Sequence, residues 1–164
     1  MATDGDNTFL LLNCWFKDVY PGFVELSSTS NGTDAFGGVL YRRCTGSESG
    51  SNVTLQTNEN EAVYAVVMKI SGNPTHEYAV LAGTAATGSS STPDPPSIAA
   101  LKESRDVLYL ACAAWDHNDA YSSNPSNYST VQNGNSGTGS GDCGGAVAYR
   151  EITSTSSSED PGTF

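Results

Sequence analysis

Short apolar runs separated by turn-forming residues recur along the whole chain. Glycine, proline, serine and asparagine fill the intervals, as in Tyr20-Pro21-Gly22, and no segment keeps a helical period. Such runs, where β-branched and aromatic residues alternate or cluster, predict strands. The predicted strands are 8–16, 23–26, 35–43, 52–56, 62–70, 78–82, 106–114 and 144–152.

The spacing of these runs predicts an all-β protein built as a single antiparallel β-sandwich with jelly-roll or Greek-key-like connections. The segment 62–70 is largely apolar on both of its alternating faces, which is typical of a strand between two layers or under long loops. Residues 97–104 fit one helical turn or a strand that ends in a turn. No repeat divides the chain, and the linker-like stretch 88–96 leaves neither half a core of its own, so we expect one domain over 1–164.

Charge narrows the classes of function. Seven Lys and Arg against 18 Asp and Glu give a net charge of −11, and the acids are scattered, which argues against binding nucleic acid through its phosphates. No apolar stretch approaches the ~18 residues of a membrane span. The first residues lack the charged and cleavable parts of a signal peptide, so we expect synthesis and retention in a cytoplasm.

The four cysteines, Cys14, Cys44, Cys112 and Cys143, have no metal-ligand spacing. We expect buried free thiols and no zinc site. The acidic stretches 4–7 and 116–119 carry oxygens that calcium could use, but neither has a full loop pattern and both are predicted to be polar turns. No metal and no cofactor are therefore predicted.

One pentapeptide, Gly141-Asp142-Cys143-Gly144-Gly145, has the spelling of the nucleophile segment in trypsin-like viral cysteine proteases. A cysteine nucleophile needs a histidine base and a group that orients it. Only 21 residues follow Cys143, too few for the strands that such a fold places after its nucleophile. We therefore predict no catalytic residues and interpret the glycines as a loop with unusual backbone angles leading into strand 146–152. The partners considered are His76 or His117, with Asp94 or Asp106.

A second candidate site combines aromatic and polar side chains after the strand 106–114. Sugar sites pair an aromatic face with amide and carboxylate hydrogen bonds. The alternative is that Trp115 packs under the loop as core and that the tyrosines fix turns. The predicted glycan-binding residues are Trp115, Asp116, Asn118, Tyr121 and Tyr128.

Several segments together resemble one known family. In the second half these are the connector Thr92-Pro-Asp-Pro-Pro-Ser97, the strand Asp106-Val-Leu-Tyr-Leu-Ala111 with Trp115-Asp116 after it, the turn Pro125-Ser-Asn-Tyr128, and 158–164. In the first half they are Phe9-Leu-Leu-Leu12, Tyr20-Pro-Gly-Phe-Val-Glu-Leu26, 39–43 and 66–72. The chain is similar along nearly its whole length to small β-sandwich, virion-associated proteins of tailed bacteriophages and environmental viral sequences.

The resemblance implies a β-sandwich fold and a place in the virion, as a head decoration or tail-associated protein, with no known reaction. Members of this family normally continue past the segment ending at Phe164 into a final apolar strand. We expect that strand either to be missing here or to be supplied by a neighbouring molecule.

Together these observations predict a non-enzymatic structural protein of a tailed-phage particle, most simply a capsid decoration protein packed on the head surface. A small chain without coiled coil or fibre repeat suits that place. The expected partners are the major capsid protein or tail proteins and copies of itself, and the expected location is the virion after synthesis in the host cytoplasm. The alternatives are a tail or fibre module that binds host-surface glycans and, more remotely, a cysteine protease that uses Cys143.

Overall fold

The fold is given by a computed structural model of the 164-residue chain. It describes residues 7–13, 22–32, 35–46, 52–54, 62–71, 80–117, 121, 123–139 and 141–164, with residues 7–13 described by their backbone. Within these ranges the protein is all-β and contains no helix. The strands are β1 (Asn7–Asn13), β2 (Val24–Asn31), β3 (Ala35–Arg43), β4 (Tyr64–Ile70), β5 (Arg105–Asp116), β6 (Ser129–Asn135) and β7 (Cys143–Thr155).

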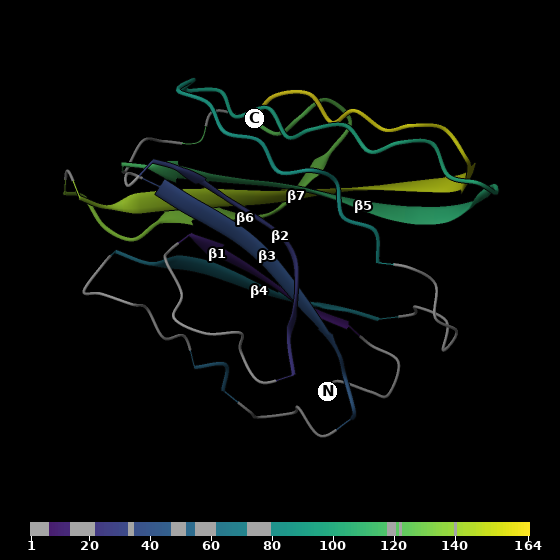
Figure 1. Cartoon of the computed structure of the whole chain (residues 1–164), viewed down its shortest axis with the longest axis horizontal. Helices are drawn as coiled ribbons and strands as arrows, with labels where there is room; N and C mark the ends of the chain where they lie inside the picture. The colour runs from purple at the N-terminus through teal and green to yellow at the C-terminus, as the bar shows by residue number, and fades with distance from the viewer. Residues whose placement is uncertain are drawn as a thin grey trace.

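The strands form two antiparallel sheets that pack together (Figure 1). One sheet has the order β2-β3-β1-β4 and the other the order β5-β7-β6. The sheets approach most closely where β3 crosses β5: a methyl group added at Gly37 would lie 3.0 Å from the Cβ of Ala114. Glycine at position 37 therefore lets the two backbones come together.

The core between the sheets is formed by one face of each. Val66 of β4 and Val147 of β7 are buried against each other, with Val39 and Cys112 packed around them. We call this side of the three-stranded sheet its inner face.

A second core covers the opposite, outer face of the three-stranded sheet. Because side chains alternate along a strand, the odd-numbered residues of β5 from Tyr109 to Ala113 and the even-numbered residues Ala146 and Ala148 of β7 point away from the other sheet and are buried. Tyr128 and Phe164 cover them. Strands β5 and β7 are thus apolar on both faces, as expected for strands between two layers.

The layer over this second core has almost no regular structure. It consists of 93–101 and 156–164, which lie on the side of β5 and β7 away from the four-stranded sheet (Figure 1). The two segments hydrogen bond through their backbones, Ile98 with Glu159 in both directions (2.8 and 3.0 Å) and Leu101 N to Ser156 O (2.9 Å). Phe164 N donates to Pro93 O at 2.8 Å. We call this pair of segments the outer layer.

The predicted strands agree with the structure where the apolar pattern is strong. The segment 35–43 coincides with β3, and 62–70, 106–114 and 144–152 lie within one to three residues of the ends of β4, β5 and β7. The 8–16 prediction covers most of β1, and its last three residues lie outside the described part.

Three predictions were wrong in the residues that the structure describes. Residues 52–54 and 80–82 are not strands, and 97–104 form neither a helical turn nor a strand beyond a single bridge at Ile98. Strand β6 was missed: no strand was predicted between 114 and 144. Its side chains are mostly exposed, so this edge strand carries no apolar alternation that sequence could reveal.

Candidate functional site

The pentapeptide that resembles a protease motif spans the start of β7: Gly141 and Asp142 precede the strand, and the other three residues are its first. Cys143, Gly144 and Gly145 pair with Asp116, Trp115 and Ala114 of β5. None of the glycines at 141, 144 and 145 has a positive φ, so the predicted loop with unusual backbone angles was wrong for these positions.

The two strand glycines instead make room for aromatic rings on opposite faces of the sheet. A Cβ at Gly144 would lie 2.3 Å from Nε1 of Trp115, on the outer face. A Cβ at Gly145 would lie 3.1 Å from Cδ1 of Tyr64, which reaches over from β4 on the inner face. Real Cβ atoms essentially never show the contact at 144, so the Trp115 ring requires glycine there, whereas a side chain at 145 would be tight and would require the Tyr64 ring to shift slightly.

Asp142 closes the turn between β6 and β7. Its carboxylate accepts hydrogen bonds from the backbone N–H of Gly139 and, at 3.4 Å, from the Ser136 hydroxyl. The N–H of Cys143 in turn donates to Ser136 Oγ at 3.0 Å. An aspartate that holds backbone and hydroxyl groups of a tight turn has a structural role.

The thiol of Cys143 lies in a buried, acidic setting. Its residue is 8 % exposed. Burial raises its pKa above the usual value, and the carboxylates of Asp142 and Asp116 raise it further against the lowering effect of hydrogen bonds with Ser136 and the Tyr64 backbone. A nucleophilic cysteine needs the opposite shift, so this thiol stays protonated at neutral pH.

His117 follows the end of β5 and is exposed, with a φ of 74°. Its Nε2 lies 3.3 Å from the carboxylate of Asp116, the residue opposite Cys143 in the strand register. Of the other protease candidates, Asp94 is exposed in the outer layer, and Asp106 accepts a hydrogen bond from Ser154 N at 2.9 Å. His76 lies outside the described residues.

The structure spreads the predicted glycan-binding residues between core and surface. Trp115 packs on Gly144, Tyr121 is half-buried against the ring of Phe164 (5.8 Å between centroids), and Tyr128 is buried. Asp116 faces His117, and Asn118 lies outside the described residues. The faces of these aromatic rings contribute to the second core, and glycan binding stays a prediction.

A charged network under the outer layer was not found from sequence. Glu159 is the buried acid of the described residues: it accepts hydrogen bonds from Arg150 Nη1 at 2.7 Å and from the Tyr128 hydroxyl at 3.0 Å. Burial and the neighbouring Glu159 raise the pKa of Tyr128. In the sequence, Glu159 lies in a Ser-Glu-Asp-Pro-Gly stretch that is typical of a solvated turn. Its burial follows from the backbone hydrogen bonds between Ile98 and Glu159, which the sequence does not reveal.

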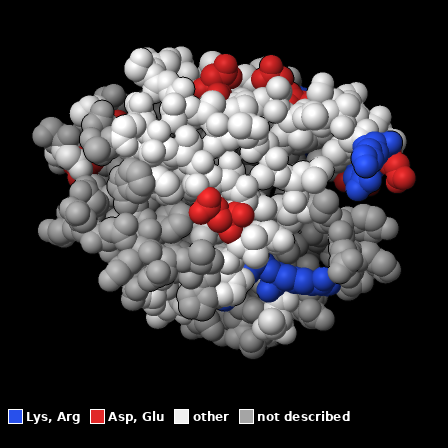
Figure 2. Space-filling view, in the orientation of Figure 1, with Lys and Arg blue, Asp and Glu red and all other residues white. Residues whose placement is uncertain are grey.

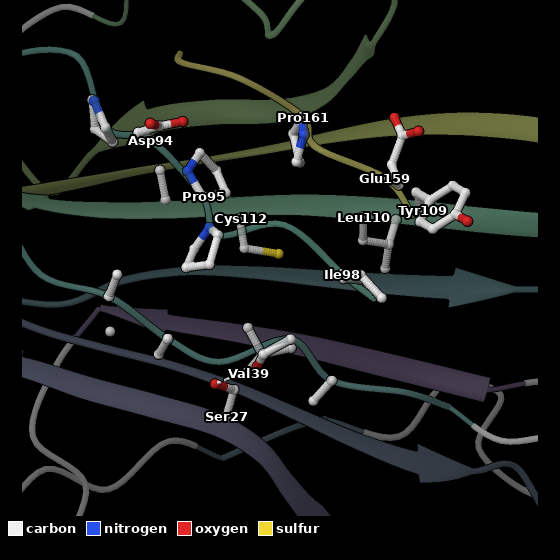
Figure 3. A pocket seen from close by; sticks show the side chains of 18 of the residues that line it. Ser27, Val39, Asp94, Pro95, Ile98, Tyr109, Leu110, Cys112, Glu159 and Pro161 are labelled. Carbon is white, nitrogen blue, oxygen red and sulfur yellow. Dashed lines mark hydrogen bonds between the residues drawn. The ribbon is translucent and has the colours of Figure 1, made fainter. Parts of the chain in front are cut away.

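A cavity of about 1480 Å³ opens where β2 and β5 are the edge strands. Its described lining comes from β2, β3, β5 and the segment 80–98 that runs across them, and it extends around the edge of β5 to the outer layer, where Glu159, Pro161 and Phe164 line it. Val39 of β3 and Leu110 and Cys112 of β5 extend toward the space between the sheets (Figure 3). We call residues 80–92, which form the outer wall, the strap.

The strap is attached weakly. In the part of the chain that the structure describes, it forms no backbone hydrogen bond with either sheet. It accepts hydrogen bonds from the Ser27 hydroxyl at Gly83 O and from the Asn31 amide at Gly88 O, both at 3.4 Å. These distances lie at the long limit for hydrogen bonds.

Carboxylates outnumber basic groups around the cavity. Glu159 is engaged by Arg150, and Arg105 lies 3.8 Å from Glu103. On the face shown in Figure 2, acidic groups lie along the top and near the centre, while basic groups lie toward the right and below. The ionisable lining residues are Asp94, Glu103, Asp106, Asp116, Glu151 and Glu159, against Arg105 and His117.

Among the described residues, no group of three or more histidine, cysteine, aspartate or glutamate side chains is placed to hold a metal ion. The same residues include no helix that is long and apolar enough to cross a bilayer. Cys44, Cys112 and Cys143 form no disulfide; Cys44 and Cys143 are buried as predicted, and Cys112 is partly buried. Comparison with protein-family models, with curated proteins and with solved structures finds no match.

Proposed function

We propose that this protein is a non-enzymatic structural component of a tailed-phage particle, a decoration protein that packs on the head surface beside the major capsid protein. The resemblance of segments in both halves of the chain to virion-associated β-sandwich proteins supports this role. The small all-β body and the charge of −11 suit a protein that works by docking on other proteins at the outside of a particle.

The observation that carries the non-enzymatic part of the proposal is the setting of Cys143. Its residue is buried within strand β7, and burial raises its pKa. The other residues of the protease-like string have packing or turn contacts of their own, Asp142 with Gly139 and Gly144 with Trp115. These contacts explain the string without a chemical step.

The connections between the strands are also part of the proposal. Strand β4 returns to lie beside β1 after β2 and β3 have been added on the other side, and the return of a fourth strand to the first is the defining feature of a Greek key. We propose a sandwich of the Greek-key or jelly-roll kind, in which β3 rather than β2 is the neighbour of β1.

Labelling of particles tests the proposal. Antibodies raised against the recombinant chain would be applied to virus particles purified from the source of the sequence, with immunogold detection and a copy count by quantitative mass spectrometry. We expect gold over the heads and a copy number comparable with that of the capsid protein. Label confined to tails would favour the tail module, and unlabelled particles that contain no peptide of this chain would reject a virion role.

A further inference from the structure

The cavity under the strap has an apolar interior that the strap does not fill. Its inner wall includes Val39, Leu110 and Cys112, whose side chains face the space between the sheets (Figure 3). The strap, Val80-Leu-Ala-Gly-Thr-Ala-Ala-Thr-Gly-Ser-Ser-Ser-Thr92, consists mainly of small residues, and its larger side chain Leu81 is 56 % exposed. Apolar walls left without a filling side chain lose contacts that a ligand can restore.

The same side of the molecule presents β2, an edge strand that has backbone pairing on one side only among the described residues. Strand β2 pairs with β3 on one side. Toward the strap its residues form only the two side-chain hydrogen bonds of Ser27 and Asn31, within the described part of the chain. An exposed edge of this kind accepts an extended polypeptide by strand addition, whereas an acyl chain or other apolar small molecule would leave its backbone groups unpaired.

The charge of the cavity lining favours a basic polypeptide over a second copy of this chain. Among the described residues, six carboxylates line the cavity against one arginine and one histidine. Glu159 is buried and paired with Arg150, whereas Asp94 and Glu151 are exposed. A second copy of this chain would bring another net charge of −11 to that lining, which costs affinity through like-charge repulsion. A segment flanked by lysine or arginine has the complementary charge.

We propose that the cavity between β2, β5 and the strap binds an extended peptide segment of a partner protein, apolar at alternate positions and flanked by basic residues. The segment adds to the edge of β2 and places its apolar side chains against Val39, Leu110 and Cys112, while the strap moves outward. This inference rests on the proposed function, because the partner is then another protein of the particle.

Selection from a displayed library of random peptides of about ten residues, the length of a long strand, tests the binding. Enriched peptides should alternate Val, Ile or Phe with polar residues and carry Lys or Arg at their ends. One such peptide, synthesised with a fluorophore, would be titrated by fluorescence anisotropy. We expect Leu110→Trp, which places a bulky ring at the apolar wall where the peptide would lie, to weaken binding at least about tenfold. The matched control is Val67→Trp on the exposed edge strand β4, outside the lining, and should leave affinity within about twofold.

A second variant keeps the test informative if Leu110→Trp does not fold. Asp94→Lys with Glu151→Lys reverses two exposed charges at the lining and should weaken binding about tenfold at low salt, with a smaller loss at about 300 mM salt. Asp160→Lys, an exposed acid outside the lining, should weaken binding far less.

Four outcomes overturn the inference. The first is a selection that yields no enriched family, and the second is a set of enriched peptides that lack basic ends. The third is an affinity that Leu110→Trp and the double lysine variant leave unchanged. The fourth is a different occupant: a dimer by light scattering that Leu110→Trp abolishes, or cis-parinaric acid that binds wild type but not Leu110→Trp.

Failure of this inference and failure of the proposed function are distinguishable. Particles labelled over their heads, together with a chain that selects no peptide, reject the peptide groove alone. Selective peptide binding by a chain that no particle contains rejects the virion role alone.

Discussion

Two segments without regular secondary structure lie against the three-stranded sheet, one over its outer face and one at the edge of its inner face. They differ in how firmly they are attached. On the outer face, 93–101 and 156–164 are joined by backbone hydrogen bonds and cover a core that buries Phe164 and Glu159. At the edge of the inner face, the strap is held by two side-chain hydrogen bonds of 3.4 Å over a cavity. A segment without regular secondary structure is therefore fixed in the fold when its backbone is hydrogen-bonded and its side chains are buried. A segment that lacks these contacts remains available for binding.

The largest expected effect breaks the close packing of the outer face. Gly144→Ala places a methyl group 2.3 Å from the Trp115 ring, so we expect a loss of about 3 kcal/mol in the free energy of unfolding, or failure to fold. Chemical denaturation followed by tryptophan fluorescence measures it.

Gly141→Ala is the control, because a Cβ there meets nothing within 4 Å and φ is not positive. Stability should change by less than about 0.5 kcal/mol. If the two alanine variants were equally stable, the ring of Trp115 would not lie on Gly144.

The next effect removes the charge that fixes the outer layer. Glu159→Gln breaks the 2.7 Å contact with Arg150, whose side chain is one-third exposed, so the loss should be about 2 kcal/mol, less than for a fully buried pair. Glu151→Gln, one residue beyond Arg150 and exposed, should cost less than about 0.5 kcal/mol. Thermal unfolding compares the two variants. An equal loss of stability in both would show that the contact between Glu159 and Arg150 does not stabilise the outer layer.

Alkaline pH probes the inner face through Cys112. Burial raises the pKa of its thiol from 9.0 to about 12. A raised pKa means that the protonated thiol is favoured in the folded state, so its contribution is complete below pH 9 and is lost between pH 9 and about 12.

At pH 10 the expected loss from this group is on the order of 1 kcal/mol. Cys112→Val should flatten the decline of stability between pH 9 and 10 in urea unfolding, leaving the share of the buried tyrosines Tyr109 and Tyr128, whose pKa values are also raised. A decline that is equally steep in Cys112→Val would place the Cys112 thiol in contact with solvent.

The smallest expected effect concerns the strap. Ser27→Ala and Asn31→Ala each remove one of its two long hydrogen bonds and should cost less than about 0.5 kcal/mol in denaturant unfolding. A loss above about 2 kcal/mol in either variant would mean that the strap is as firmly attached as the outer layer.

Sequence predicted the strands whose apolar residues alternate or cluster. It assigned two buried faces to 62–70, which was wrong: β4 is an edge strand with Val67 exposed, and the strands buried on both faces are β5 and β7. It missed β6 because an exposed edge strand looks like a polar loop, and it assigned 80–82 to a strand because apolar residues without a pairing partner leave the same signature. The absence of catalytic residues in the protease-like string stays a prediction, and its glycines were wrongly explained by backbone angles. Their cause is two aromatic rings, Trp115 and Tyr64, that only the strand register brings opposite them.

The most direct test of the contrast between the outer layer and the strap is hydrogen–deuterium exchange of the full chain at neutral pH. The amides of Ile98, Leu101, Glu159 and Phe164 donate to backbone carbonyls and should remain protected for about an hour or longer. The amides of residues 81–91 lack such acceptors in the described structure and should exchange within about a minute. Equal protection in both segments, or a strap that exchanges more slowly than the outer layer, would contradict the account.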